Sequence, residues 1–185
     1  MSATAQQDER TVPGALATTL QAMFAQMHGW LEGTTQDLTT EQCHWQPSGR
    51  VVPAGAHYAH HVMGAEDMMI NMMIRGTTPL VMGEWQDRTG VSEILPMGAW
   101  DEWARRITIE LPSLRTYAQA VYANTDAYLA TITPEEWNRK LDLSAVGMGE
   151  STVGALLTDV LLDGAAHCGE ISAVKGLQGL QGYPF

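Results

Sequence analysis

Four long segments of this chain repeat their apolar residues at spacings of three and four. This periodicity places apolar side chains on one face of an α-helix, whereas a half-buried strand alternates every second residue. Strand signals are weak throughout, so the pattern predicts an all-α protein. The four sets are Leu16, Leu20, Met23, Phe24, Met27, Trp30 and Leu31; Ala65, Met68, Met69, Met72 and Met73; Leu114, Ala118, Val121, Tyr122, Tyr128 and Leu129; and Leu156, Leu157, Val160, Leu161, Ile171, Val174 and Leu177.

Capping and helix-breaking residues indicate where these helices begin and end. The second long helix is expected over 53–74, the third begins at Pro112, and Ser151 is expected to cap the fourth. A short helix is expected over 99–107. The Gly- and Pro-rich residues 75–98 then form a long connection, and a connection of that length in a compact domain is more often functional than idle.

Two short sequences with helix-start residues echo each other. Leu38-Thr-Thr-Glu-Gln precedes a loop and the second long helix, and Ile132-Thr-Pro-Glu-Glu precedes a loop and the fourth. The echo indicates two helix–connection–helix halves and hence a four-helix bundle. We expect one domain over residues 12–185 and a disordered, polar N-terminus over residues 1–11.

The charge balance excludes several classes of partner. Lys and Arg total 10 against 21 Asp and Glu, which gives a net charge of −11. Nucleic acids and anionic membranes require clustered basic residues, so neither is expected as a partner. No segment is long and apolar enough to span a membrane, and the first residues lack a secretion signal. With two cysteines that form no disulfide framework, the sequence predicts a cytoplasmic protein.

Three of the six histidines, His57, His60 and His61, lie within five residues at the start of the second helix. On an α-helical wheel, His61 and His57 share the apolar face and point into the core. His60 falls on a polar face and is expected to point to solvent. The neighbours that define this polar face are Gly64, Asp67 and Asn71.

Asp163 and His167 lie four residues apart on the apolar stripe of the fourth helix. An aspartate on such a stripe is costly unless it is paired or coordinates a cation. Three interpretations remain open: a hydrogen-bonded Asp–His pair in a polar core, a stripe rotated so that Asp163 reaches water at the end of the bundle, or two ligands of a metal site. Three protein ligands with one open position are typical of a catalytic metal, and the histidines of the second helix favour that interpretation.

Other common chemistries find no support in the sequence. The zinc-protease motif His-Glu-x-x-His is absent, and so are a nucleophile elbow and a phosphate-binding glycine loop. A di-iron bundle requires two Glu-x-x-His motifs with two further glutamates. The chain has only Glu41-x-x-His44, at a helix start.

Three pieces of sequence, in this order and spacing, resemble one known family: Leu38-Thr-Thr-Glu-Gln-Cys-His-Trp-Gln-Pro47, His60-His-Val-Met-Gly-Ala-Glu66 and His167-Cys-Gly-Glu-Ile171. The chain resembles, over nearly its whole length, the DinB-like superfamily of metal-binding four-helix bundles, which includes bacterial thiol transferases and mycothiol-dependent maleylpyruvate isomerases. The resemblance implies a long connection between helices 2 and 3.

The resemblance also implies a ligand set and an activity. It implies metal ligands His61, Asp163 and His167; the usual triad is three histidines, so Asp163 is a departure. His57 has no counterpart among the usual ligands and is kept as a candidate auxiliary group. The metal would be divalent, zinc first, with nickel, iron or manganese as alternatives, and would activate a water or a low-molecular-weight thiol against a small electrophile.

Further roles follow from this interpretation. Glu66 and Glu170 would orient a ligand or move a proton, and Arg75 and Arg88 would bind an anionic cofactor beside a connection that walls the site. The partner would be a small-molecule substrate, and a homodimer is expected by analogy.

Two alternatives to a thiol transferase remain. Two histidines and one carboxylate also suit a non-haem iron(II) oxygenase. A non-catalytic, dimerising stress or binding module would use the same polar cluster as a structural element.

Overall fold

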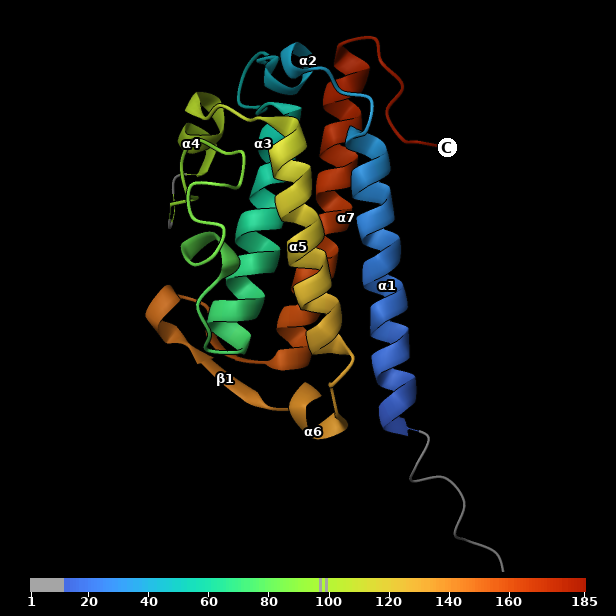
Figure 1. Ribbon diagram of the computed structural model, residues 1–185, viewed down its shortest axis with the longest axis vertical. Helices are drawn as coiled ribbons and strands as arrows, with labels where there is room; N and C mark the ends of the chain where they lie inside the picture. Colours follow the sequence, from blue (N-terminus) through green and yellow to red (C-terminus); the bar gives the residue numbers. More distant parts are fainter. Residues whose placement is uncertain (1–11, 97, 99) are drawn as a thin grey trace, which may run out of the picture.

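Four long helical segments run side by side along the long axis of the molecule (Figure 1). The structure is a computed structural model that describes residues 12–96, 98 and 100–185; the expected disorder of residues 1–11 lies outside this range. The long segments are α1 (Val12–Thr35), α3 (Ala54–His60) continuing into η1 (His61–Ile74), α5 (Leu111–Leu129) and α7 (Val153–Leu177). Helix α7 packs on α1, α3 and η1, and α5 packs on α1 and η1. The predicted all-α four-helix bundle is confirmed.

Four short helices lie at the ends of the bundle or against the second long helix (Figure 1). They are α2 (Thr40–His44), η2 (Leu80–Met82), α4 (Trp100–Arg106) and α6 (Pro134–Trp137). Thr39 caps α2 in a full capping box with Gln42, and Thr133 caps α6 by accepting from the Glu136 backbone N–H. Both echoed sequences therefore begin short capped helices, as their residues predicted, and the long connection between η1 and α5 is present.

A small antiparallel hairpin precedes α7, and the sequence analysis did not predict it. Strand β1 (Lys140–Leu143) pairs with β2 (Gly149–Thr152), with η3 (Ser144–Val146) between them. The expectation that Ser151 caps α7 is wrong, because Ser151 pairs with Leu141 in the hairpin and Thr152 accepts from the Ala155 backbone N–H instead. Strands of four residues are too short for the alternation that identifies a strand in sequence.

The second long helix changes its pitch at His61. It is an α-helix up to His60 and a π-helix from His61 to Ile74, where the Arg75 backbone N–H donates to the Ile70 carbonyl five residues earlier (3.0 Å). Bonds from i to i+5 widen each turn, and such π segments occur often at functional sites. Side chains on one face of η1 therefore recur every four to five residues rather than every three to four.

A polar layer divides the core of the bundle. One apolar cluster lies toward the α2 end and another toward the hairpin end. On α1 the change falls between Met27 and Leu31, and on α7 between Val160 and Cys168. Buried or half-buried polar side chains fill the gap: His28, His61, Glu66, Asp163 and His167.

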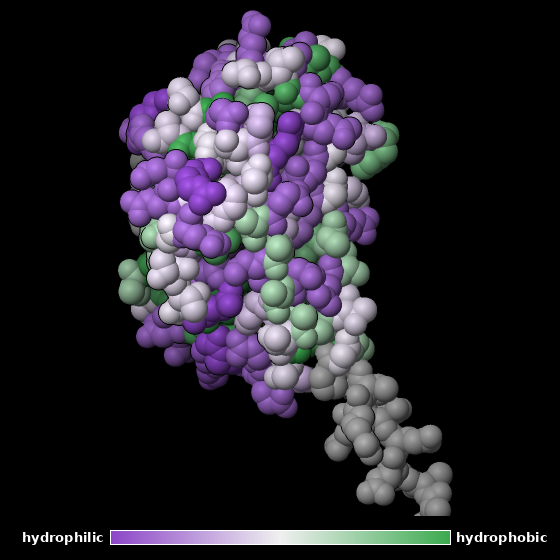
Figure 2. All heavy atoms as spheres, in the orientation of Figure 1, coloured by the Kyte–Doolittle hydropathy of each residue, from purple (hydrophilic) through white to green (hydrophobic). Residues whose placement is uncertain are grey.

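Polar residues dominate one face of the molecule. Figure 2 shows mostly hydrophilic residues on the viewed face, with hydrophobic ones scattered among them. None of the helices within the described residues combines the length and apolarity needed to cross a bilayer.

Candidate metal centre

Three side chains from two helices bring donor atoms to one point. His60 ends α3, and Asp163 and His167 lie one turn apart on α7. His60 Nδ1 lies 2.9 Å from His167 Nε2, and Asp163 Oδ1 lies 3.4 Å from the same nitrogen. All three donors lie within 4.8 Å of one another. Two imidazoles and one carboxylate thus converge at the middle of the bundle.

This donor set fits a divalent metal ion. Zinc bonds to nitrogen and oxygen are about 2.0–2.1 Å long, which places neighbouring donors of a tetrahedron about 3.3–3.4 Å apart. The contacts of His167 Nε2, at 2.9 and 3.4 Å, lie close to that spacing. Imidazole and carboxylate are ligands that zinc, iron and nickel accept. The cluster is therefore a candidate metal centre by donor chemistry and by spacing.

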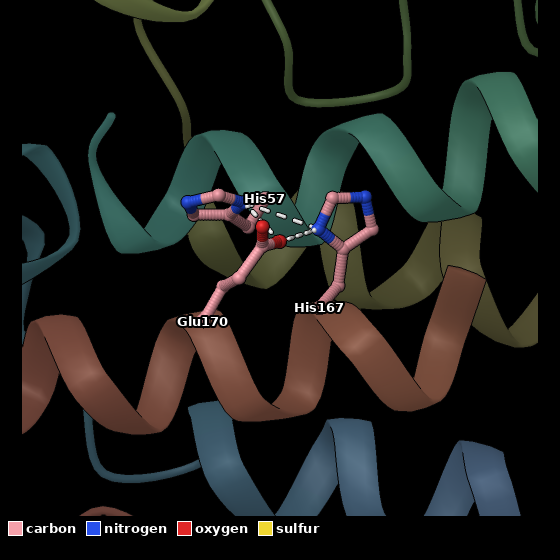
Figure 3. A group of neighbouring side chains, drawn as sticks. All are labelled: His57, His167 and Glu170. Carbon is pink, nitrogen blue, oxygen red and sulfur yellow. Dashed lines mark hydrogen bonds and ion pairs between the residues drawn. The ribbon is translucent and has the colours of Figure 1, made fainter. Parts of the chain in front are cut away.

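The other ring nitrogen of His167 faces a second group (Figure 3). His167 Nδ1 donates to Glu170 Oε2 at 2.5 Å, and His57 Nδ1 lies 3.0 Å from the same oxygen. The two Nδ1 atoms are 3.1 Å apart, so these three donors form a further group with metal-like spacing. A proton on Nδ1 leaves the Nε2 lone pair of His167 free for the first group, as in many carboxylate–histidine–metal arrangements.

A chain of buried polar contacts leads from Asp163 away from the solvent. His61 donates from Nδ1 to Asp163 Oδ2 at 2.8 Å. Its Nε2 lies 3.4 Å from Glu66 Oε2, an ion-pair distance without hydrogen-bond alignment. Glu66 in turn accepts from His28 Nε2 at 2.9 Å. The chain joins α1, η1 and α7 through the polar layer.

The protonation states of the donors suit a metal site. Burial lowers the pKa of His60 to about 4, and the neighbouring His167 lowers it further in the same direction. Burial also lowers the pKa of His57 to about 4, although Glu170 opposes this effect. Burial alone would raise the pKa of Asp163, but hydrogen bonds from His167 and His61 hold it well below its usual range. Neutral imidazole and ionised carboxylate are the forms that coordinate metals.

The inner pair carries opposite charges. Burial would lower the pKa of His61, but hydrogen bonding to Asp163 and interaction with Glu66 raise it to about 9. Burial would raise the pKa of Glu66, but His28 and His61 lower it to about 2. His61 is therefore an imidazolium and Glu66 a carboxylate at neutral pH, both fully buried.

An apolar pocket of about 270 Å³ opens beside His60 and Asp163. The π-helical face of η1 forms one wall, because residues four to five apart line it. The connection that precedes α4 and the turn between β1 and β2 form the rest of its lining. The lining residues are His60, Gly64, Ala65, Met68, Met69, Met73, Leu95, Pro96, Gly98, Trp100, Val146, Met148 and Asp163.

A second pocket of about 520 Å³ lies on the other side of Trp100, whose ring is 4.6 Å from that of His60 and 5.6 Å from that of His57. Trp100 lines both pockets and so separates them. The second pocket is more polar, with one basic residue. Its lining residues are Arg50, Val51, Val52, His57, Trp100, Asp101, Glu170, Ala173, Val174 and Leu177.

The structure brings Asp163 and His167 together, but with His60 at the converging position. The expectation that His60 faces solvent is wrong. Asp67 and Asn71, which made its face look solvated, are buried and bond to each other at 2.8 Å. The wheel assumed 3.6 residues per turn, whereas η1 turns more slowly. His61 as a ligand stays a prediction; its ring nitrogens face Asp163 and Glu66, and it belongs to neither converging group.

The other predicted site residues lie in different surroundings. Glu170 and His57 adjoin the cluster, whereas Glu66 lies behind it in the core. Arg75 donates to Asn71 and Asn124. The Arg88 guanidinium lies over the Trp85 ring, 5.2 Å from its centre. Neither arginine lines either of the two pockets. The residues of the connection that line them are Leu95, Pro96 and Gly98.

Sequence reasoning missed two contributors, His28 and Trp100. His28 lies four residues after Phe24 on the apolar face of α1, so the same spacing argument that selected Asp163 could have selected it. No spacing pattern in the sequence marks Trp100, because the tertiary path of the connection before α4 brings its ring beside His57 and His60.

Comparisons with known proteins agree with this architecture. A family described as the DinB superfamily matches residues 11–171. A crystal structure of a conserved protein of locus from Enterococcus faecalis has a TM-score of 0.72 and 18% identity, covering 86% of this chain and 95% of that chain. At that identity the likeness shows a shared fold alone. No curated protein sequence matches the chain.

Proposed function

This chain belongs to the DinB superfamily, and we propose that it is a metal-dependent enzyme that transfers a thiol to a small apolar electrophile. The observation that carries the proposal is the convergence of His60, Asp163 and His167 beside an apolar pocket. His60 and Asp163 line that pocket themselves, so a bound substrate would lie against the metal donors. The open side of the cluster is what a catalytic site requires and a structural site lacks.

We assign the roles of the surrounding residues from their contacts. His60, Asp163 and His167 would hold the metal. Glu170 accepts from His167 Nδ1 and thereby fixes the tautomer that leaves Nε2 as a ligand. When bound, a divalent ion at this site supplies Lewis acidity, which lowers the pKa of a thiol or water and generates a nucleophile near neutral pH.

The two pockets suggest how the reactants are separated. The Met-lined pocket suits an apolar electrophile, since flexible thioethers adapt to varied shapes. Low-molecular-weight thiols often carry carboxylates, and this protein is strongly acidic. Arg50 is the basic residue among the lining residues of the two pockets, so we place the anionic part of the thiol there. Trp100 would keep the two reactants on defined sides of the cluster.

The experiment is turnover of a panel of apolar electrophiles with low-molecular-weight thiols by the zinc-loaded protein. We expect thiol consumption that the His60→Ala variant loses together with bound zinc. His44→Ala is the matched control, because His44 bonds to Thr40 and Ile109 at a distance from the cluster. Stoichiometric zinc without thiol consumption across the panel would contradict the proposed reaction.

A second candidate function follows from the donor set itself. Two histidines and one carboxylate with open positions are the ligands of non-haem iron(II) oxygenases. The iron-loaded protein would then consume oxygen with an organic substrate. Oxygen uptake that requires His60, with no thiol consumption, would favour this function over thiol transfer.

The group formed by His57, His167 and Glu170 offers a different place for the metal. Occupation of that group would make His57 a ligand and His60 dispensable. Zinc content of His57→Ala and His60→Ala separates the two placements. We expect His60→Ala to lose the metal and His57→Ala to retain it.

A further inference from the structure

A run of buried polar side chains crosses the apolar core of this bundle. Glu66 and His61 are both 0% exposed, and the His28 side chain is only 12% exposed. Taking a carboxyl group and its imidazole partners out of water costs free energy that their mutual attraction seldom exceeds, and well-packed apolar residues would serve stability as well or better. Stability alone is therefore a weak explanation for this chain of contacts.

The chain ends on one particular oxygen of the candidate metal centre. His61 donates to Oδ2 of Asp163, while Oδ1 of the same carboxylate faces His167 Nε2. Thus Oδ2 of Asp163 contacts His61 in the core, and Oδ1 faces the donor cluster. Asp163 is 30% exposed, and without the bond from His61 its carboxylate would be free to rotate toward the pocket.

We propose that Glu66 and His28 are positioning residues that act through His61 to hold the Asp163 carboxylate with Oδ1 turned toward the metal. This inference rests on the proposed metal site but is independent of the proposed reaction. Carboxylate ligands are commonly fixed by such outer partners, whose removal weakens metal binding.

Packing fixes each member of the chain. The His28 ring stacks on Tyr122 with ring centres 3.7 Å apart, which orients Nε2 toward Glu66. His61 lies against α7 at Gly164, where an added Cβ would come within 2.8 Å of the His61 Cε1 atom. The absence of a side chain at Gly164 therefore lets the His61 ring approach Asp163 closely.

Asp67, the neighbour of Glu66, provides a comparison. It is also 0% exposed, but it bonds to Tyr117, Asn71 and the backbone N–H groups of Leu80 and Val81. Those bonds fasten the connection after η1 and do not reach the donor cluster. Among the described residues, the side-chain partners of Glu66 are two imidazoles, His28 and His61, and His61 in turn bonds to Asp163. Two adjacent buried carboxylates thus have separable roles.

The test measures zinc affinity by chelator competition, with thermal melting of the metal-free protein as the second readout. We expect Glu66→Gln to weaken Zn²⁺ binding about 10- to 100-fold, in the range for outer partners of a ligand. Asp67→Asn should lower the melting temperature and leave Zn²⁺ affinity unchanged. If Glu66→Gln does not fold, His28→Asn, at the partly exposed end of the chain, should weaken Zn²⁺ binding in the same direction.

A double-mutant cycle identifies the route of the effect. If Glu66 acts through Asp163, adding Glu66→Gln to Asp163→Asn should weaken Zn²⁺ binding no further. Additive losses in the cycle, or equal Zn²⁺ affinity of Glu66→Gln and the unaltered protein, would overturn the inference. Zinc bound without turnover would refute the proposed reaction alone. An unaltered protein that binds no Zn²⁺ would refute the metal site and this inference with it.

Discussion

His60 and His167 bring ring nitrogens to 2.9 Å of each other across the α3–α7 contact, although 107 residues separate them in sequence. The helix changes from α to π directly after His60, so that Ala65, five residues later, joins Gly64 on the face of this histidine, and all three line the apolar pocket. His61, the next residue, turns into the core. One step along the helix thus separates a candidate ligand from a residue that supports one.

We predict different metal affinities for His60→Ala and His61→Ala. His60→Ala removes a donor and should abolish stoichiometric Zn²⁺ binding. His61→Ala removes only the inner partner of Asp163 and should weaken binding while retaining it. Elemental analysis after dialysis against limiting chelator measures both. Zinc lost from His61→Ala and retained in His60→Ala would reverse our ligand assignment in favour of His61.

The metal-free protein should be most stable near pH 6.5. Below that pH, His57 and His60 are protonated in the unfolded chain but stay neutral in the folded protein until about pH 4. The free energy of unfolding therefore falls as the pH falls. Above it, folded His61 keeps a proton, held by Asp163 and Glu66, that the unfolded chain has lost. This stability is complete below pH 6.5 and disappears as the pH rises through about 9.

Denaturant unfolding across pH 4–9 measures this profile. His61→Asn should flatten the decline between pH 6.5 and 9, because it removes the group that binds the extra proton. An alkaline decline that persists unchanged in His61→Asn would assign it to another group.

Gly164→Ala should destabilise the protein and weaken Zn²⁺ binding together. The new Cβ would clash with Met27 Sδ and lie 2.8 Å from His61 Cε1, and overpacking of this kind costs about 1–3 kcal/mol. Gly29→Ala is the control, since no atom of the described residues outside the local helix backbone lies within 4 Å of an added Cβ, and α1 should gain about 0.5–1 kcal/mol. Equal unfolding free energies for Gly164→Ala and the unaltered protein would show that the α1–α7 contact can open at no cost.

Bound Co²⁺ should quench the fluorescence of Trp100, whose ring centre lies 4.6 Å from that of His60. Trp100→Phe should therefore lose most of the quenching seen on Co²⁺ titration. Trp30→Phe should keep it, because Trp30 packs against Phe185 on the outside of the bundle. Quenching that survives Trp100→Phe intact would place the metal elsewhere.

Ala65→Leu should narrow the apolar pocket without touching the donors. For bulky electrophiles kcat/KM should fall about tenfold, which equals ~1.4 kcal/mol, whereas small electrophiles and Zn²⁺ affinity should be unaffected. Rates measured across a size series test this. Equal losses for small and bulky electrophiles would mean that the pocket does not bind the substrate.

Local patterns in the sequence determined the helices and their caps. The spacing of apolar residues located all four long segments, and Thr39 and Thr133 identified two short helices, because caps and helix faces depend on residues only a few positions apart. The same spacing identified Asp163 and His167 as a pair. Sequence patterns did not predict the hairpin before α7, since its four-residue strands are defined by their pairing with each other and are too short to show an alternating pattern.

Only the tertiary structure decided which histidine of the second helix joins Asp163 and His167. That choice depends on the pitch of η1, and the π-helical hydrogen bonds leave no trace in apolar spacing read at 3.6 residues per turn. The tertiary structure also decided that His28, Glu66 and His61 connect behind the site, because their contacts join three helices that are far apart in sequence. The residue types for a metal site are present in the sequence, but the packing of the helices determines which of them meet.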